Sequence, residues 1–126
     1  MNTRTVVEKY FESVNMQDWD TWLTLFADDV IFDDSISGRK EGINAIRDTG
    51  SNTMAVFQKF ENNIVHIVVE GDLAMVVCHI SAITKDGALL ESTGANLYHV
   101  KNGKILSVKS IHDSAPFFKA FSTENV

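Results

Sequence analysis

Two adjacent aspartates are the residues whose position most directly suggests acid/base chemistry. Asp33 and Asp34 follow the apolar run Val30-Ile31-Phe32, where a predicted strand meets a loop. Because successive strand residues face opposite sides of a sheet, one carboxylate points inward and the other outward. A carboxylate in an apolar pocket has its pKa raised by desolvation, which suits a general base near neutral pH. The alternative is a solvated acidic pair at the exit of a strand.

A histidine in the middle of a predicted strand is a second candidate. His79 shares one strand face with Val77 and Ser81, whereas Cys78 and Ile80 share the other face. Histidine titrates near neutral pH, so His79 is a candidate acid/base group if its face lines a pocket. The alternative is a structural histidine with its hydrogen bonds satisfied.

The end of the last predicted strand offers two more titratable groups, His112 and Asp113. Strand alternation places them on opposite faces of the sheet, so only one of them faces a given side. A bulge at the end of the strand would admit both to the same side. The sequence leaves both alternatives open.

The sequence contains no motif typical of a metal site, a phosphate-binding loop or a nucleophilic serine. The four histidines, His66, His79, His99 and His112, are scattered singly and lack metal-ligand spacing. There is one cysteine, Cys78, which excludes a cysteine cluster and an internal disulfide. No glycine-rich phosphate loop and no nucleophile elbow is present. We therefore expect no metal and no cofactor.

Length and charge limit the class of protein. The chain has 126 residues, 44% of them hydrophobic, which predicts a single domain over residues 1–126. The net charge of −6 argues against nucleic acid as a partner, because phosphate backbones would be repelled. The apolar stretches are too short to span a membrane, and the start of the chain does not resemble a signal peptide. With the single cysteine, these features predict a cytoplasmic protein.

Helical spacing dominates the first half of the chain. Apolar residues predict an amphipathic helix over residues 3–15 and a shorter helix beginning after Asp18, which serves as its N-cap. Asp28-Asp29 ends the second helix, and Val30 starts a strand. Residues 38–42 form a polar connection. A third helical region is predicted from Ile43 to Phe60, with an interruption near Gly50.

Strand patterns dominate the second half. Four strands are predicted, over residues 64–70, 73–84, 89–100 and 105–112. Tight turns join them, and Asn102-Gly103 is a strong type I′ hairpin signal. Helices followed by an antiparallel meander predict an α+β fold, with the helices packed on one face of a curved sheet.

Three segments carry a resemblance to a known superfamily. The segments Val7–Tyr10, Asn15–Asp29 and Gly38–Arg47 resemble the nuclear transport factor 2-like superfamily, and in particular ketosteroid isomerase and the SnoaL-like polyketide cyclases. The resemblance covers nearly the whole chain and implies a cone-shaped fold. That fold hosts many different activities, so it does not by itself specify one.

The resemblance implies roles for individual residues. Asp34 matches the proton-shuttling aspartate of ketosteroid isomerase, and Tyr10 matches its oxyanion-stabilising tyrosine. Asn96 stands where the isomerase has a protonated aspartic acid, and an amide can also donate a hydrogen bond. The position of His79 implies a cavity-facing residue, as in scytalone dehydratase. The isomerase favours His112 as the inward residue, whereas the cyclase favours Asp113.

We therefore predict a cofactor-independent enzyme that acts on a hydrophobic, carbonyl-containing small molecule as an isomerase, aldol-type cyclase or dehydratase. Asp34 is the predicted base, Tyr10 and Asn96 are the oxyanion donors, and His79 or Asp113 returns the proton. The alternative is a non-catalytic binding or dimerisation module of the same fold. The family implies a homodimer, for which we expect an apolar outer sheet face formed by Val76, Ile80, Ala82 and Leu97.

Overall fold

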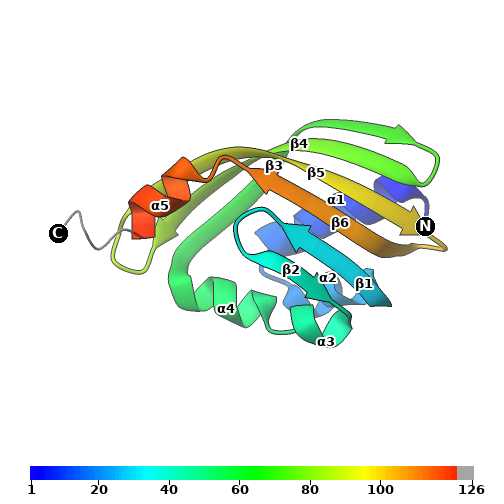
Figure 1. The fold of residues 1–126 in the computed structure, drawn as a ribbon, viewed down its shortest axis with the longest axis horizontal. Helices are drawn as coiled ribbons and strands as arrows, with labels where there is room; N and C mark the ends of the chain where they lie inside the picture. Colours follow the sequence, from blue (N-terminus) through cyan, green and yellow to red (C-terminus); the bar gives the residue numbers. More distant parts are fainter. Residues whose placement is uncertain (122–126) are drawn as a thin grey trace.

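The computed structural model describes residues 1–121 and shows an α+β architecture (Figure 1). The elements in chain order are α1 (Thr3–Asn15), α2 (Trp19–Thr24), β1 (Phe26–Asp34), β2 (Gly38–Glu41), α3 (Ile43–Ile46), α4 (Thr49–Val56), β3 (Phe57–Glu70), β4 (Leu73–Thr84), β5 (Leu89–Lys101), β6 (Lys104–His112) and α5 (Ala115–Phe121). In this part of the chain, no helix has both the length and the apolar character needed to cross a membrane.

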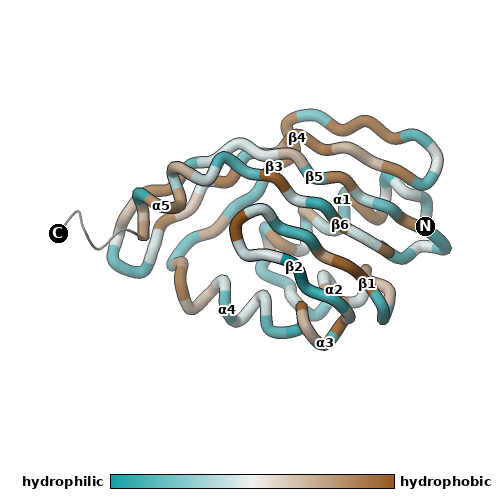
Figure 2. The backbone as a smooth tube through the Cα atoms, viewed as in Figure 1, coloured by the Kyte–Doolittle hydropathy of each residue, from teal (hydrophilic) through white to brown (hydrophobic). Residues whose placement is uncertain are grey.

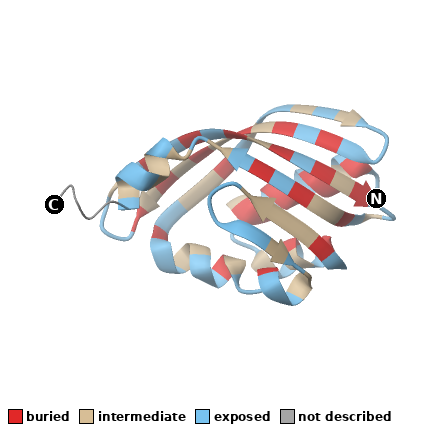
Figure 3. Cartoon of the chain, in the orientation of Figure 1, coloured by how far each residue is buried: buried red, intermediate tan, exposed pale blue. Residues whose placement is uncertain are grey.

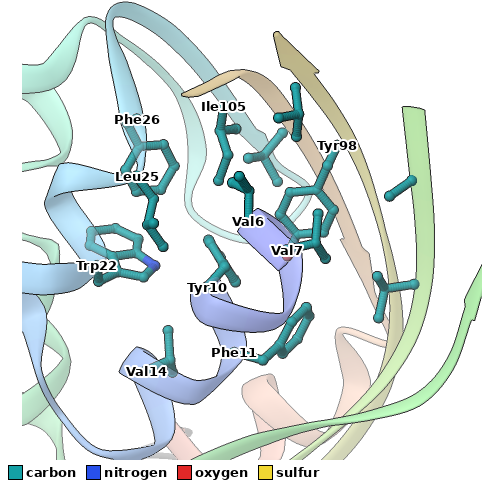
Figure 4. Close-up of a cluster of buried hydrophobic side chains, with 14 of the residues drawn as sticks. Val6, Val7, Tyr10, Phe11, Val14, Trp22, Leu25, Phe26, Tyr98 and Ile105 are labelled. Carbon is teal, nitrogen blue, oxygen red and sulfur yellow. The ribbon is translucent and has the colours of Figure 1, made fainter. Parts of the chain in front are cut away.

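The first helix follows the sequence prediction residue for residue. The Asn2 side chain caps it by accepting a hydrogen bond from the Thr5 backbone N–H. Its buried face is apolar and packs on β3, β4 and β5 (Figure 4). That face consists of Val6, Val7, Tyr10, Phe11 and Val14. The burial of this stripe fixes the helix on the inner face of the sheet.

The six strands form one sheet in the order β2-β1-β6-β5-β4-β3. The neighbours from β6 to β3 are antiparallel, as predicted, but β1 pairs with β6 in parallel. The polar connection predicted at residues 38–42 is instead strand β2, which pairs with β1 and forms one edge of the sheet. These pairings place the end of β1 beside the end of β6 (Figure 1).

Two predicted boundaries were wrong. The second helix ends at Thr24, and β1 already begins at Phe26. Phe57 and Phe60 belong to β3 rather than to the third helical region. Their spacing of three imitates a helix, but the register of β3 shifts between Phe57 and Lys59. Such a bulge lets two residues three apart face the same side of a strand, and both phenylalanines pack into the core.

The hairpin turns match their sequence signals. Asn102 and Gly103, between β5 and β6, both have positive φ angles, 53° and 75°. This is the backbone that a type I′ turn requires, and asparagine followed by glycine is the pair that adopts it most readily. The turn aligns β6 with β5, and so it contributes to the position of the residues at the far end of β6.

Burial alternates along the two central strands, β4 and β5 (Figure 3). Figure 2 shows that hydrophobic residues also occur on the more exposed face, as at Met75 and Val77 of β4. On β4 the residues facing the helices include Val76, Cys78, Ile80 and Ala82, all buried. The prediction that Val76, Ile80 and Ala82 form an apolar outer face is therefore wrong, and of that set only Leu97 is exposed. These small apolar side chains are part of the core because α1 covers this face of the sheet.

Candidate active site

A cavity of about 200 Å³ lies between the N-terminal helices and the inner face of the sheet. Many of the side chains that line it are aromatic, and aspartate, histidine, asparagine and hydroxyl groups lie among them. The lining residues are Tyr10, Val14, Trp19, Trp22, Phe32, Asp34, Ile36, Ser37, Thr49, Thr53, Phe60, Asn62, Ile80, Asn96, Ser110, His112 and Phe117. A largely apolar pocket with a few convergent polar groups is typical of a small-molecule site.

Asp34 lies at the end of β1 and lines the cavity. Its Oδ1 accepts hydrogen bonds from the backbone N–H groups of Ile36 and Ser37, at 2.7 and 3.0 Å. These bonds form a turn that fixes the orientation of the carboxylate. Asp33, its neighbour, is not among the lining residues, as the alternation of a strand requires.

His112 lies at the end of β6 and lines the same cavity. Its backbone N–H donates to Ser35 Oγ at 3.1 Å, which joins the end of β6 to the turn that follows Asp34. Burial lowers the pKa of the imidazole, and the negative charge of Asp34 partly opposes that shift. His112 is therefore a neutral imidazole at neutral pH, close enough to Asp34 to feel its charge.

Tyr10 and Asn96 both line the cavity and are connected through Tyr98. Asn96 Nδ2 donates to the Tyr98 hydroxyl at 2.8 Å, and the rings of Tyr98 and Tyr10 meet edge to face with centroids 5.1 Å apart. Burial raises the pKa of Tyr10 strongly, a hydrogen bond with Tyr98 lowers it, and the charge of Asp34 raises it. Tyr10 therefore keeps its proton at neutral pH and can donate it in a hydrogen bond.

Most of the chain matches one known domain family. The model of the SnoaL-like domain matches residues 7–108. The chain belongs to the SnoaL-like domain family. No curated protein matches this SnoaL-like chain in sequence.

Solved structures with the same fold are described in different terms. A protein of ketosteroid isomerase-like fold from Catenulispora acidiphila superposes with a TM-score of 0.83 at 17% identity, covering 91% of this chain and 90% of that one. An epoxide hydrolase from M. tuberculosis gives 0.79 at 18% identity, with 92% and 86% covered. A protein assigned as a SnoaL-like polyketide cyclase from Shewanella putrefaciens gives 0.79 at 16%, with 95% and 96% covered. At these identities the similarity establishes the fold alone.

Two of the predicted residues lie outside the cavity of this SnoaL-like protein. His79 is on the outer face of β4, with its Nε2 3.5 Å from Glu91 Oε2 and its Nδ1 3.2 Å from Thr93 Oγ1. The expectation that Val77, His79 and Ser81 face the cavity is wrong, because burial of the opposite face of β4 decides the orientation of the strand.

Asp113 also lies away from the cavity, which resolves the alternative between it and His112 in favour of His112. Asp113 Oδ1 accepts from the Ala115 backbone N–H at 3.2 Å, at the start of α5. This carboxylate sits where the negative charge is favourable, next to the free N–H groups of a helix. The structure assigns it a position at the start of α5 rather than in the cavity wall.

Sequence reasoning missed several lining residues. The sequence patterns did not single out Trp19 or Trp22, and Asn62 lies before the strand predicted over residues 64–70. All three line the cavity. The two tryptophans at helical spacing were the available signal, but such a pair indicates a buried helix face without indicating a cavity.

Two glycines make room for cavity side chains. A Cβ atom on Gly94 would lie 2.2 Å from His112 Nδ1, and one on Gly50 would lie 2.3 Å from Trp19 Cγ. Real Cβ contacts are never that short, so only glycine lets the imidazole and the indole pack where they do. These glycines help to position the cavity wall without lining it.

The unpaired buried polar atoms of residues 1–121 are concentrated at the cavity. They are Trp19 Nε1, Trp22 Nε1, Asn62 Oδ1, Asn96 Oδ1 and His112 Nδ1, and every one belongs to a lining residue. An unpaired buried polar group costs about 1–3 kcal/mol. A fold that concentrates such groups around one cavity is suited to a ligand that supplies their hydrogen-bond partners. Among the described residues, no group of three His, Cys, Asp or Glu side chains could hold a metal ion.

The burial of His112 predicts a pH-dependent stability. Because its pKa is lowered by folding, the unfolded chain binds a proton more readily than the folded chain. The stabilising contribution of the neutral, buried imidazole is complete above its pKa in the unfolded chain, about 6.5, and is lost as the pH falls through its pKa in the folded chain. We expect the free energy of unfolding to fall less steeply between about pH 7 and pH 5 in His112→Gln than in the wild type, as measured by urea denaturation.

The matched control is His66→Gln, which removes an exposed histidine from β3. It should leave the wild-type pH slope in place. An unchanged slope in His112→Gln would contradict the assignment of the pH dependence to the cavity imidazole.

Proposed function

We propose that this SnoaL-like protein is a cofactor-independent acid/base enzyme that transfers a proton at the carbon next to the carbonyl group of a hydrophobic small molecule. The observation that carries the proposal is the convergence of Asp34, Tyr10 and His112 on one aromatic cavity. They come from β1, α1 and β6, three separate elements. A carboxylate, a protonated phenol and a neutral imidazole are the groups that such chemistry needs.

The proposed reaction begins with the carboxylate. Asp34 removes the α-proton of the substrate, and the electron pair of the broken C–H bond moves through carbon to the carbonyl oxygen. The Tyr10 hydroxyl donates a hydrogen bond to the enolate oxygen that forms, and Asn96 supports this donor through Tyr98. The proton on Asp34, which is partly exposed, exchanges with solvent, and Asp34 then delivers a proton to a carbon of the enolate, which restores the carboxylate. His112 supplies a second polar group on the cavity wall, where it is neutral and able to donate through a ring N–H.

The placement of the residues favours isomerisation within the predicted class. Asp34 and Tyr10, which supported isomerisation, line the cavity. Asp113 and His79, which supported cyclisation and dehydration, lie outside it. The lining residues include no arginine or lysine, so the cavity supplies no permanent cation to a reaction. The alternative of a binding module without catalysis would leave the convergence of these three groups unexplained.

The experiment is hydrogen–deuterium exchange at the α-carbon of a small panel of hydrophobic β,γ-unsaturated ketones, followed by NMR in D₂O. We expect the wild-type protein to accelerate exchange above the buffer rate. Asp113→Asn and His79→Gln should retain this activity, because both side chains lie outside the cavity. Exchange no faster than in buffer across the panel would contradict the proposal and favour the binding module.

A further inference from the structure

We propose that Asn62 is a substrate-binding residue, and that it selects carbonyl compounds that also carry a hydrogen-bond donor such as a hydroxyl group. The inference rests on the proposed function, since it specifies the substrate of the same cavity. It assigns a role to a residue that neither the sequence patterns nor the proton-transfer step requires.

The first observation is an unpaired amide oxygen in the cavity wall. Asn62 lies on β3, is 7% exposed and lines the cavity beside Ile80, its pairing partner on β4. Its Oδ1 is fully buried and accepts no hydrogen bond within the described part of the chain. A leucine at this position would fill similar space without the cost of an unpaired acceptor. The asparagine is therefore best explained by a donor that arrives with the ligand.

The second observation is that the backbone of Asn62 is held in place. β3 is an edge strand, so one side of its backbone has no neighbouring strand. Asn15, at the end of α1, occupies that side: its Oδ1 accepts from the Asn62 N–H at 2.8 Å, and its Nδ2 donates to the Asn62 carbonyl at 3.0 Å. This two-way contact anchors the backbone of Asn62 to α1, and the alternation of the strand directs its side chain to the buried face.

The two ends of the Asn62 amide differ in what they can bind. Burial raises the pKa of the Cys78 thiol to about 11, and a hydrogen bond with the Asn62 side chain partly offsets the shift. The Oδ1 atom is the end of the amide that is buried without a partner. An amide oxygen accepts hydrogen bonds and cannot donate them, so the matching ligand group is a donor.

The rest of the cavity indicates that the ligand is not an anion. Asp34 is the one acidic lining residue, and neither lysine nor arginine lines the wall. A ligand carboxylate or phosphate would therefore meet a like charge with no cation to offset it. The aromatic walls and the volume of about 200 Å³ suit a single-ring compound. The inferred substrate is an aromatic or alicyclic ketone without a negative charge and with a hydroxyl group remote from its carbonyl.

A matched pair of probes tests the inference. 4-Hydroxyacetophenone and 4-methylacetophenone have similar shapes, but the second carries a methyl group in place of the donor. We expect the wild-type protein to bind the hydroxyl compound about tenfold or more tightly, as measured by NMR titration, because the methyl compound leaves Oδ1 unpaired. In Asn62→Leu we expect this preference to disappear. Asn63→Leu, the same substitution at the exposed neighbouring position, should keep it, because it removes one hydrogen bond from Asn15 Nδ2 but leaves both bonds between Asn15 and the Asn62 backbone.

The outcomes separate this inference from the proposed function. Equal binding of the two probes by the wild type, binding of neither, or an undiminished preference in Asn62→Leu would each overturn the role of Asn62. If Asn62→Leu does not fold, Asn62→Ala provides the same comparison. The methyl protons next to the carbonyl of each probe also report exchange. Selective binding without exchange would therefore contradict the proton-transfer proposal alone, and exchange without selectivity would contradict the role of Asn62 alone.

Discussion

Asp34→Asn is expected to lower the rate of α-proton exchange by about 10²–10⁴-fold, the usual contribution of a positioned general base. The substitution removes the basic carboxylate but keeps a side-chain oxygen that can accept the hydrogen bonds from Ile36 and Ser37. The turn at the end of β1 should therefore survive, and the loss of rate should not arise from unfolding. The exchange rate and the urea midpoint are measured on the same preparation.

Asp33→Asn is the matched control for this experiment. It makes the same chemical change one residue earlier on β1, at a position that does not line the cavity. We expect it to retain the wild-type exchange rate. If Asp34→Asn exchanged substrate protons as fast as Asp33→Asn, Asp34 could not be the base.

Gly94→Ala is expected to destabilise the protein by about 1–3 kcal/mol, the usual cost of forcing extra volume into a packed site. The new Cβ would lie 2.2 Å from His112 Nδ1 and 2.6 Å from the Ile111 carbonyl oxygen. The imidazole can move away, but the carbonyl belongs to the backbone of β6 and cannot move without disturbing the strand. The variant should therefore displace His112 from the cavity and also strain the β5–β6 pairing.

Two measurements separate these effects. Urea denaturation reports the loss of stability, and the NMR signals of the His112 ring report its displacement. The double variant Gly94→Ala, His112→Ala should recover only part of the stability lost on adding the methyl group, because the contact with Ile111 remains. Ala95→Ser, the next position on β5, should change stability by less than about 0.5 kcal/mol. Unchanged ring signals in Gly94→Ala would contradict the positioning role of Gly94.

Local patterns predicted the features that depend on neighbouring residues. The bounds of α1, the N-cap at Asp18 and the turn at Asn102-Gly103 depend on interactions within a few residues, and all three match the structure. The order of helices and strands predicted the α+β fold, and the family resemblance added its cone shape; the structure and its similarity to solved structures confirm both. Asp34, Tyr10 and Asn96 lie on the cavity wall, although their catalytic roles stay predictions.

The features that depend on distant residues could not be predicted in this way. The parallel pairing of β1 with β6 joins strands from opposite ends of the chain, and no local pattern encodes it. The face that His79 occupies was wrong because the choice between two alternating faces depends on which one α1 covers. The unpaired Oδ1 of Asn62 could not be predicted either, because the position of this residue depends on Asn15, 47 residues earlier, which binds its backbone. The sequence therefore supplied candidates, and tertiary packing decided among them.

The parallel pairing of β1 and β6 also has a consequence for how the protein is made. The hydrogen bond between the His112 N–H and Ser35 spans 77 residues of sequence, and it joins two sides of the cavity. A chain that is still being synthesised can form α1 and the first strand early, but it lacks one wall of the cavity until its last strand has left the ribosome. Contacts between such distant segments slow folding, because a long loop must close before they form. During that interval the aromatic side chains that later line the cavity are exposed, so nascent chains of this protein should depend more on chaperones than completed ones do.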